Sequence, residues 1–462
     1  MPYSKLPPKL LLLASTLSIA TLCLLLLTSR LPTAHLLPSL GRTAIEDLTH
    51  DTAFFPPHPE HCAGNTGVAE DGNPCAGFPV HLHEDIQIVV KTGIGERHRL
   101  EALLSTFASC FSNILIMSDV QGKVLGHEVY DVLADLPSSY AVNNPDWEAY
   151  ETQRKAYKAG EAISKSHQGW KLDRFKFLPM IEKTFKIRPK AKWYVFIESD
   201  TYYFWDTLFR VLSDLNPNER HYLGNAVAGA DNVWFAYGGA GFVLSKKLMR
   251  DINHVTPPMS HKHEELIKGD CCGDIALAYS LYRELEARVE GMYPTFSGDE
   301  PSSVEIDEAR RCVPLLALHR VSPEQMKSLW KWERCRVYTE APLTYLDFLD
   351  YSLAHLARLA GSFQKSHWDN GANLEQPSNS SMSECFESCN KSPGCLQSTY
   401  SEEGTCRFAE FAKSGREVEQ KMQSSWNPKS LARLGWTTDG GKSRNVCEKD
   451  FQWQEPVFKP FP

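Results

Sequence analysis

The chain has 462 residues, of which 42% are hydrophobic and 11% aromatic. A chain of this length and composition can bury a large core and has room for about two or three domains, so it belongs among globular rather than disordered proteins. The formal net charge of −8 and the lack of any block of Lys and Arg argue against a broad polyanion-binding surface. We therefore do not expect nucleic acid as a partner.

An uncharged apolar run occupies residues 10–27, with Lys5 and Lys9 before it and Arg30 after it. The run just reaches the roughly 20 residues that cross the hydrocarbon core of a bilayer. The basic side should stay in the cytosol, which sends the rest of the chain into the lumen of the secretory pathway. We predict an uncleaved transmembrane signal anchor; the alternative is a signal peptide cleaved near Thr33-Ala34.

The cysteine content agrees with a luminal location. Of 13 cysteines, Cys23 lies in the apolar run and an even number follows it, which suits disulfides in an oxidising compartment. They lack a CxxC…CxxC pattern, which argues against structural zinc. Asn379-Ser380-Ser381 and Asn390-Lys391-Ser392 are glycosylation acceptors if they face the lumen.

Ordered structure is predicted to begin after a stem, which Cys62 and Cys75 hold in place. Residues 85–91 form a short run of β-branched residues, as in a buried parallel strand, and residues 97–110 repeat Leu and Phe with helical spacing. With a second strand at 113–119 these segments make a βαβ unit, whose connection should be right-handed.

The following segments continue an α/β pattern. After a polar stretch we predict a helix over residues 170–186 that Pro179 interrupts, and then the most apolar strand, residues 193–197. Two more strands are expected at 221–223 and 241–244, and Ser245 should cap the next helix. The consistent architecture is an α/β sandwich with a mainly parallel sheet.

Composition changes beyond this region. Four closely spaced cysteines (Cys385, Cys389, Cys395 and Cys406) predict a small disulfide-supported module. The predicted divisions are a cytosolic tail (1–9), the anchor (10–29), a stem (30–80), the α/β domain (81–340), a linker (341–375), the Cys-rich module (376–450) and a C-terminal tail (451–462).

Two acids, Glu198 and Asp200, follow the most apolar strand directly. In open α/β sheets, ligands collect outside the carboxyl ends of the strands. Two carboxylates one residue apart on such a turn can offer oxygens to a hard divalent cation that also binds water and phosphate. The alternative is a solvated loop acid, or Asp200 as the N-cap of the next helix.

Three later features belong with these acids. Tyr237 and the glycines of residues 238–241 precede a strand, where backbone can approach a ligand closely, although a plain turn is the commoner explanation. Asp274 stands at a helix start, where simple capping is an equal alternative. His319 ends an apolar stretch, where a lone His is more often a satisfied core side chain. The order of acid-x-acid, Gly-rich turn, isolated acid and late His is far more specific than any one part.

In this order the sequence resembles glycosyltransferase family 31, in particular the fringe and core 1 β-1,3-galactosyltransferase branch. The resemblance covers about residues 84 to 322. It implies a GT-A type fold, with one nucleotide-binding α/β domain behind a type II membrane anchor. The matching residues are Val90-Lys91-Thr92, Ser118-Asp119, Glu198-Ser199-Asp200-Thr201-Tyr202, Gly238-Gly239-Ala240-Gly241, Gly273-Asp274 and Leu318-His319.

The resemblance also implies roles for these residues. Asp200 and His319 would hold Mn²⁺ against the diphosphate of a UDP-sugar, and Asp274 would be the general base that activates an acceptor hydroxyl. The α-linked donor would give a β-linked product. Residues near the nucleotide would be Lys91, Thr92, Arg97, Asp119, Glu198 and Ser199, and Gly238 and Gly239 would lie near the sugar. Apart from the resemblance, Trp234 and Tyr237 are candidates to line a sugar or acceptor site by stacking, although aromatic residues near a core strand are more often core packing.

Two positions depart from the family pattern. Glu198 replaces the first aspartate of the DxD motif and is one methylene longer, so its contact to metal or ribose can differ. Gly273 replaces the acid before the base. Neither change removes the metal ligand or the base, which favours an active enzyme over a relative that has lost catalytic activity.

The leading hypothesis is a Golgi-type, Mn²⁺-dependent, inverting UDP-sugar transferase that makes a β-1,3 linkage on a glycan or glycoprotein. The competing hypothesis is a membrane-tethered carbohydrate-binding protein with a silent α/β domain. Its recognition would come from the Cys-rich module, whose cysteine spacing resembles a PAN/apple module; a purely structural C-terminal cap is the alternative for this module. A glycosidase also uses two carboxylates but needs no nucleotide pocket, so Lys91-Thr92 counts against it.

Overall fold

The computed structural model describes residues 75, 82, 84–161, 167–229, 232–334, 341–357, 362–377, 381–436, 444–447 and 451–460. The expected cytosolic tail, the anchor and nearly all of the stem lie outside these residues, as do Cys23, Cys62, Cys335 and Asn379. In the part of the chain that the structure describes, no helix has the length and apolar character needed to cross a membrane.

A nine-stranded sheet forms the centre of the α/β domain, in the order β21-β11-β7-β10-β5-β1-β2-β4-β3. Four adjacent strands run parallel to one another: β5 (Trp193–Glu198), β1 (Ile86–Lys91), β2 (Leu115–Ser118) and β4 (His127–Asp131). All six residues of β1 are buried, as expected of an apolar run covered on both faces. The two strands expected at 85–91 and 113–119 are thus confirmed as parallel neighbours.

The other half of the sheet departs from the predicted parallel arrangement. Here β10 (Phe242–Ser245) runs antiparallel to both β5 and β7 (Tyr222–Gly224). A parallel return needs a crossover of a dozen or more residues, usually helical. Between β7 and β10 the chain instead makes a small hairpin, β8 (Ala226–Ala228) with β9 (Trp234–Ala236). The sheet is therefore mixed.

Two further strands extend this half of the sheet. β11 (Glu290–Gly291) pairs with β7 in parallel, and β21 (Val457–Phe458) pairs with β11 in antiparallel fashion. The predicted C-terminal tail thus supplies an edge strand. At the opposite edge, β3 (Gly122–Val124) pairs with β4.

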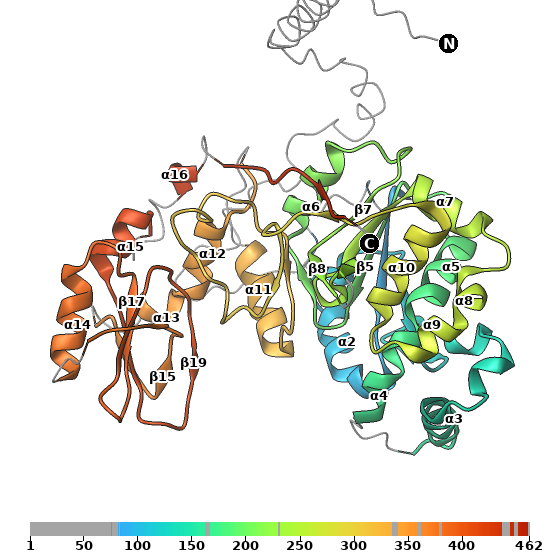
Figure 1. Cartoon of the computed structure of the whole chain (residues 1–462), viewed down its shortest axis with the longest axis horizontal. Helices are drawn as coiled ribbons and strands as arrows, with labels where there is room; N and C mark the ends of the chain where they lie inside the picture. The colour runs from blue at the N-terminus through green and yellow to red at the C-terminus, as the bar shows by residue number, and fades with distance from the viewer. Residues whose placement is uncertain are drawn as a thin grey trace, which may run out of the picture. The chain divides into compact units, whose positions relative to one another are not determined.

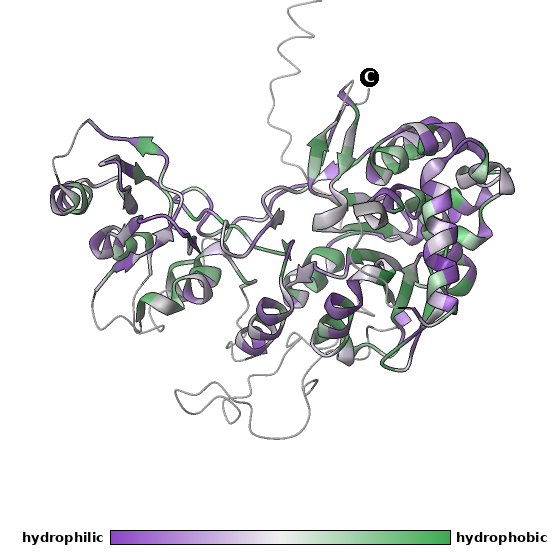
Figure 2. Ribbon diagram, turned by 90° about the horizontal axis from the view of Figure 1, so that it is seen from below, coloured by the Kyte–Doolittle hydropathy of each residue, from purple (hydrophilic) through white to green (hydrophobic). Residues whose placement is uncertain are grey.

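Alternate residues of the central strands face two separate apolar cores. Ile88 and Val90 contribute to one core, together with α2 (Arg97–Leu104), α6 (Trp205–Ser213) and α11 (Pro323–Arg334). Val89 contributes to the other, together with α5 (Phe177–Ile187), α7 (Lys246–His254) and α10 (Gly273–Leu285). This is the period of two expected of strands, with a helical layer on each face (Figure 1). In Figure 2 these covering helices carry both hydrophobic and hydrophilic residues, as amphipathic helices do.

Two predicted helices differ in their bounds. The helix expected over 97–110 ends at Leu104 and is followed by a 3-10 turn at Phe107–Cys110, where Cys110 bonds to Cys75. The helix expected over 170–186 is broken near residue 172 rather than at Pro179. Pro179 lies in the first turn of α5, where its missing N–H has no helical partner to lose.

The remaining elements of the domain are shorter. A three-stranded sheet joins β12 (Phe296–Asp299), β13 (Ala317–Leu318) and β6 (Tyr202–Tyr203). Helices are α3 (Pro145–Lys158), α4 (His167–Lys171), α8 (Met259–Lys262), α9 (Glu264–Gly269), α12 (Tyr345–Ser352) and α13 (Ala354–Ala357), and 3-10 turns lie at Ile94–Glu96, Leu133–Asp135, Ser138–Ala141, Asp173–Phe175 and Gly238–Ala240.

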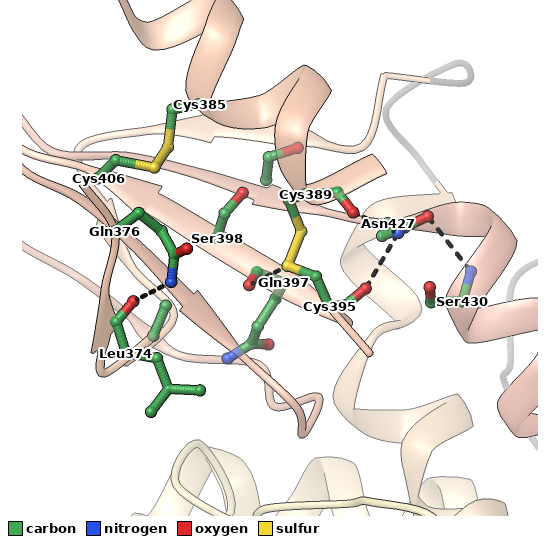
Figure 3. Close-up of a disulfide and its surroundings, with 12 residues drawn as sticks. Leu374, Gln376, Cys385, Cys389, Cys395, Gln397, Ser398, Cys406, Asn427 and Ser430 are labelled. Carbon is green, nitrogen blue, oxygen red and sulfur yellow. Dashed lines mark hydrogen bonds between the residues drawn. A yellow bond between two sulfur atoms is a disulfide. The ribbon is translucent and has the colours of Figure 1, made fainter. Parts of the chain in front are cut away.

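The Cys-rich module is a five-stranded antiparallel sheet with helices. Its sheet order is β14-β20-β17-β18-β16, and disulfides join Cys385 to Cys406 and Cys389 to Cys395 (Figure 3). β14 begins at Gln364, so residues predicted as linker already belong to the module. Its elements are β14 (Gln364–Ser366), β15 (Trp368–Asp369), β16 (Leu374–Glu375), α14 (Met382–Lys391), β17 (Gln397–Tyr400), β18 (Cys406–Ala409), β19 (Arg416–Glu417), β20 (Gln423–Trp426), α15 (Pro428–Leu434) and α16 (Arg444–Cys447).

Ser245 is predicted to contribute strongly to the stability of the fold because its side chain is hydrogen-bonded to three other residues. Its fully buried hydroxyl accepts from the N–H groups of Leu248 (3.3 Å) and His221 (3.0 Å) and donates to the carbonyl of Glu219 (2.6 Å). Ser245→Ala should lower the free energy of unfolding by about 1–3 kcal/mol, because buried groups lose their partners. Urea unfolding tests this. The exposed N-cap variant Ser381→Ala is the control, with an expected loss of about 1 kcal/mol or less; equal losses would contradict the argument.

Candidate active site

Several predicted site residues lie at one edge of the sheet, where the parallel strands β1, β2 and β5 end. Lys91 at the end of β1 is the register partner of Glu198 at the end of β5, and β2 lies on the other side of β1. The residues just beyond these strand ends are Thr92, Asp119, Ser199 and Asp200, and all four are buried. All of these predicted residues line one cavity of about 230 Å³.

Glu198, Asp200 and His319 form a compact group of potential metal ligands. One ligand atom from each lies within 4.8 Å of the other two. His319 Nε2 is 3.4 Å from Asp200 Oδ1 and 4.0 Å from Glu198 Oε2. Asp200 accepts no capping hydrogen bond from the next helix, α6, whose N-cap is Phe204. The metal-site hypothesis therefore fits the geometry better than the capping alternative.

The imidazole of His319 contacts Tyr237 and Gly239 on the sides that do not face the carboxylates. The Tyr237 hydroxyl lies 2.8 Å from His319 Nδ1, which leaves Nε2 toward the two carboxylates. Such an outer partner commonly fixes the ring orientation of a metal-binding histidine. Gly239 completes the support, since a Cβ there would lie 2.3 Å from His319 Cε1. The glycine is required because the ring packs directly on the backbone.

Basic side chains surround the acids on the nucleotide side. Lys91 pairs with both Asp173 and Glu198, the latter at 3.1 Å. Burial alone would lower the pKa of Lys91, but these two carboxylates outweigh it and raise the pKa above its usual value. Lys176, which is also buried, lies 3.0 Å from Asp119 and donates to the carbonyl of Thr92 at 2.9 Å. The Lys91 ammonium group therefore remains charged in this environment.

The acids differ in their protonation tendencies. Burial raises the pKa of Glu198, although Lys91 opposes the effect. Burial also acts to raise the pKa of Asp200, but His319 and Arg99 outweigh it, so that the pKa lies below its usual value. Arg99 Nη1 is 2.8 Å from Asp200 Oδ2. Asp200 is thus ionised at neutral pH, as a metal ligand has to be.

The charge balance of the cavity suits a divalent cation. Its lining contains three basic side chains and five acidic ones, which leaves an excess of two carboxylates. Two carboxylates and one imidazole form a donor set that a hard or borderline cation such as Mn²⁺ accepts. The residues present therefore fit the metal that the family resemblance implies.

A second cavity of about 600 Å³ adjoins the first, because Arg99, Trp170, Asp173, Glu198 and Asp200 line both. Asp274 lines this second cavity together with Tyr237, Gly239 and His319. Its Oδ2 accepts from the N–H of Gly238 at 3.0 Å, and its Oδ1 from the N–H of Ile275 at 3.0 Å. Burial raises the pKa of Asp274 against these hydrogen bonds, which makes the carboxylate a better proton acceptor.

The departure at Gly273 has a steric cause in this chain. A Cβ at this position would lie 2.4 Å from the Phe177 ring and 2.7 Å from the carbonyl oxygen of Arg174. The start of α10 therefore packs against the segment before α5 too closely for any side chain. No second carboxylate can stand beside Asp274 at this point.

Three predicted residues lie elsewhere. Arg97 is an exposed side chain paired with Glu101 at 2.8 Å and lines neither cavity. Arg99 takes the expected position, because residues two apart on a helix point in nearly opposite directions. Trp234 also lines neither cavity and lies under Lys459, 5.1 Å from the ring centroid. Gly238 contributes its N–H to Asp274 rather than a surface to the cavities.

Several residues of the two cavities were not predicted from sequence. Asp173 and Lys176 fall where one continuous helix was expected, and the helix break near residue 172 is what turns them toward β1. Trp170, 70% exposed, borders both cavities. The adjacent Cys271 and Cys272, bonded to each other, line the second cavity. The only sequence signal for these two cysteines was that they stand just before Gly273-Asp274.

Comparison with known proteins agrees with this geometry. Residues 82–296 match the family model described as Fringe-like. Among solved structures, a glycosyltransferase involved in the glycosylation of the major capsid of PBCV-1 is similar, at 12% identity over 53% of this chain and 98% of that chain. Its TM-score is 0.22, so this likeness carries no argument.

Short matches to two curated proteins were also found. They are a probable calcium-binding mitochondrial carrier of Caenorhabditis elegans (32% identical over 117 residues) and another of Caenorhabditis briggsae (28% over 126 residues). The matches cover 24% and 26% of this chain, and the chain spans 21% and 23% of the lengths of those proteins. Matches of this extent transfer no activity.

The acids gathered beyond the parallel strand ends lie where open α/β sheets bind their ligands, and His319 reaches the same place from the smaller sheet. Residues 82–296 form a Fringe-like domain, of the kind found in glycosyltransferase family 31. The match to this family model is evidence for a glycosyltransferase.

The close packing of Gly239 on His319 predicts that Gly239→Ala disrupts the metal-binding group. The added methyl would push the imidazole away from Asp200. We expect Mn²⁺ affinity to fall about 10- to 100-fold, the range typical for loss of a ligand's support. Isothermal titration with Mn²⁺ measures this. Gly269→Ala, where a Cβ meets nothing within 4 Å, is the control and should leave affinity unchanged. If Gly239→Ala bound Mn²⁺ with unchanged affinity, the assignment of His319 as a metal ligand would be contradicted.

Proposed function

We propose that the protein is a metal-dependent, inverting glycosyltransferase that moves a hexose or N-acetylhexosamine from a UDP-sugar to a glycan or glycoprotein acceptor. The observation that carries the proposal is the group Glu198, Asp200 and His319, which lies between two adjoining cavities with Asp274 in the second. A β-1,3 linkage and a Golgi location, with the catalytic domain in the lumen behind a type II anchor, complete the proposal on the strength of the family resemblance.

The first cavity has the charges needed to hold a nucleoside diphosphate. Asp200 and His319, with Glu198, would hold Mn²⁺, which neutralises the negative charge that develops on the departing UDP. Lys91, Lys176 and Arg99 surround the same space with buried or half-buried positive charge. These cations stabilise phosphate oxygens in a site of low dielectric constant.

The second cavity has the base needed on the acceptor side. The Asp274 carboxylate takes the proton of an acceptor hydroxyl, and the resulting oxygen attacks the anomeric carbon of the donor. The bond between that carbon and the UDP oxygen breaks on the opposite face, which inverts the configuration. Placing base and phosphates in cavities that meet at Glu198 and Asp200 supports such an in-line displacement.

The decisive experiment is a titration of UDP into the purified protein by calorimetry, with Mn²⁺ and then with EDTA. We expect binding that requires metal and that is lost in Asp200→Asn, because the amide keeps the shape of the side chain but removes the ligand charge. The exposed Asp135→Asn is a matched control, since Asp135 pairs only with Lys183 at the surface and should bind like the wild type. Absence of UDP binding under every condition would refute the proposal.

A second prediction separates chemistry from binding. Asp274→Asn should bind UDP and Mn²⁺ as the wild type does, yet lose at least about 100-fold in kcat, the usual contribution of a general base. Wild-type activity should fall as the pH drops through the pKa of Asp274. That pKa lies above the ordinary value of about 3.9, since burial disfavours the carboxylate. A pH–rate profile under saturating substrates checks this, and a variant with full activity would remove Asp274 from the reaction.

The alternative of a catalytically silent carbohydrate-binding protein makes opposite predictions. Such a protein would bind glycan in the absence of UDP and metal, and Asp274→Asn would leave that binding intact. The raised pKa of Asp274 and its place in a cavity beside the metal-binding group favour the enzyme.

A further inference from the structure

The disulfide between the adjacent residues Cys271 and Cys272 differs from the others in its surroundings. Each other disulfide in the described part of the chain includes a cysteine that is at most 5% exposed, as with Cys110 and Cys447. Cys271 is exposed and Cys272 half-buried, and both line the 600 Å³ cavity that contains Asp274. The bonded pair thus borders the space that the acceptor would occupy.

Two ordinary roles do not account for this bond. A disulfide stabilises a fold mainly by closing a loop in the unfolded chain, and bonded neighbours close almost none. Cys272 is the N-cap of α10, yet its side chain makes no capping hydrogen bond. Asp270, Cys271 and Cys272 also cluster like metal ligands, but thiolates bind metals and disulfide sulfurs are no longer thiolates.

The chemistry of the surrounding wall indicates what it would contact. Disulfide sulfur is polarisable and offers no strong hydrogen-bond donor. Phe177 and the exposed Trp170 line the same cavity as the disulfide, and Asp274 follows Cys272 by two residues along the chain. Apolar groups and carboxylates in one cavity suit a sugar ring, which has a C–H face for the apolar groups and hydroxyls at its edge for the carboxylates.

We propose that the Cys271–Cys272 disulfide is part of the acceptor subsite and contacts the C–H face of a hexopyranose whose hydroxyl faces Asp274. This inference rests on the proposed transferase function and deepens it by assigning the acceptor class and a residue pair that recognises it. The disulfide takes no part in electron transfer. Its role is to present a firm, apolar surface next to the base, where Gly273 leaves no side chain to do so.

The test compares kinetic constants in the full-length protein. The acceptors are a panel of p-nitrophenyl hexopyranosides and N-acetylhexosaminides, used with the donor that wild type turns over best and with Mn²⁺. In Cys271→Ala/Cys272→Ala we expect the acceptor KM to rise about tenfold, the usual effect of one lost apolar contact. The donor KM, the UDP affinity and the acid limb of the pH–rate profile should not change, because neither donor cavity nor base is altered.

The control removes a different disulfide, one that also closes a short loop. Cys389→Ala/Cys395→Ala breaks a bond across 6 residues in the Cys-rich module, and neither cysteine is among the lining residues of the two cavities. It should leave the acceptor KM unchanged. Cys271→Ser/Cys272→Ser serves as a second variant if the alanine pair does not fold, and UDP titration reports whether each variant has an intact donor site.

The outcomes are distinguishable. Wild type that binds no UDP refutes the transferase itself, before the disulfide is considered. Active wild type with an unchanged acceptor KM in the folded Cys271/Cys272 variants overturns the subsite. A lower kcat with a shifted acid limb and an unchanged acceptor KM also overturns it, since the bond would then only position Asp274.

Discussion

The site depends on one constraint: charges that are removed from water at the carboxyl edge of the sheet need partners. Lys91 is almost fully buried at the end of β1 and is stable there because Asp173 and Glu198 flank its ammonium group. The same holds for Lys176 beside Asp119. Removing one member of such a pair leaves an uncompensated buried charge, so the network is fixed as a unit. What remains after pairing is an excess of negative charge, which a divalent cation would satisfy.

Those parts of the site that follow strand ends could be predicted from sequence, because a strand fixes where its last residue lies. An apolar run that ends in an acid brings that acid to the ligand-binding edge whatever the loops do. Lys91, Asp119, Glu198 and Asp200 are of this kind. His319 follows β13, which belongs to a different sheet, so spacing alone could not place it beside Asp200. Its role was available only through the family resemblance.

The remaining differences between prediction and structure have physical causes that a sequence pattern does not contain. Arg97 and Arg99 are equally basic, and only the rotation of α2 decides that Arg99 contacts Asp200. Trp234 is aromatic and close to the Gly-rich turn, but the β8–β9 hairpin directs it to Lys459. The antiparallel direction of β10 arises because a hairpin, and not a helix, precedes it. In each case tertiary packing selects among alternatives that the local sequence leaves open.

The two departures from the family pattern are connected through the geometry of the cleft. Glu198 is long enough for one carboxylate oxygen to pair with Lys91 while the other lies toward His319, so the extra methylene joins the cation network to the metal-binding group. Gly273 lets α10 approach Phe177 and Arg174, and that contact positions Asp274 under the N–H of Gly238. The proton affinity of Asp274 is therefore set by burial and backbone hydrogen bonds, and not by a neighbouring carboxylate. The close packing at Gly239 and at Gly273 thus holds the His319 imidazole and the Asp274 carboxylate in place by direct contact with the backbone.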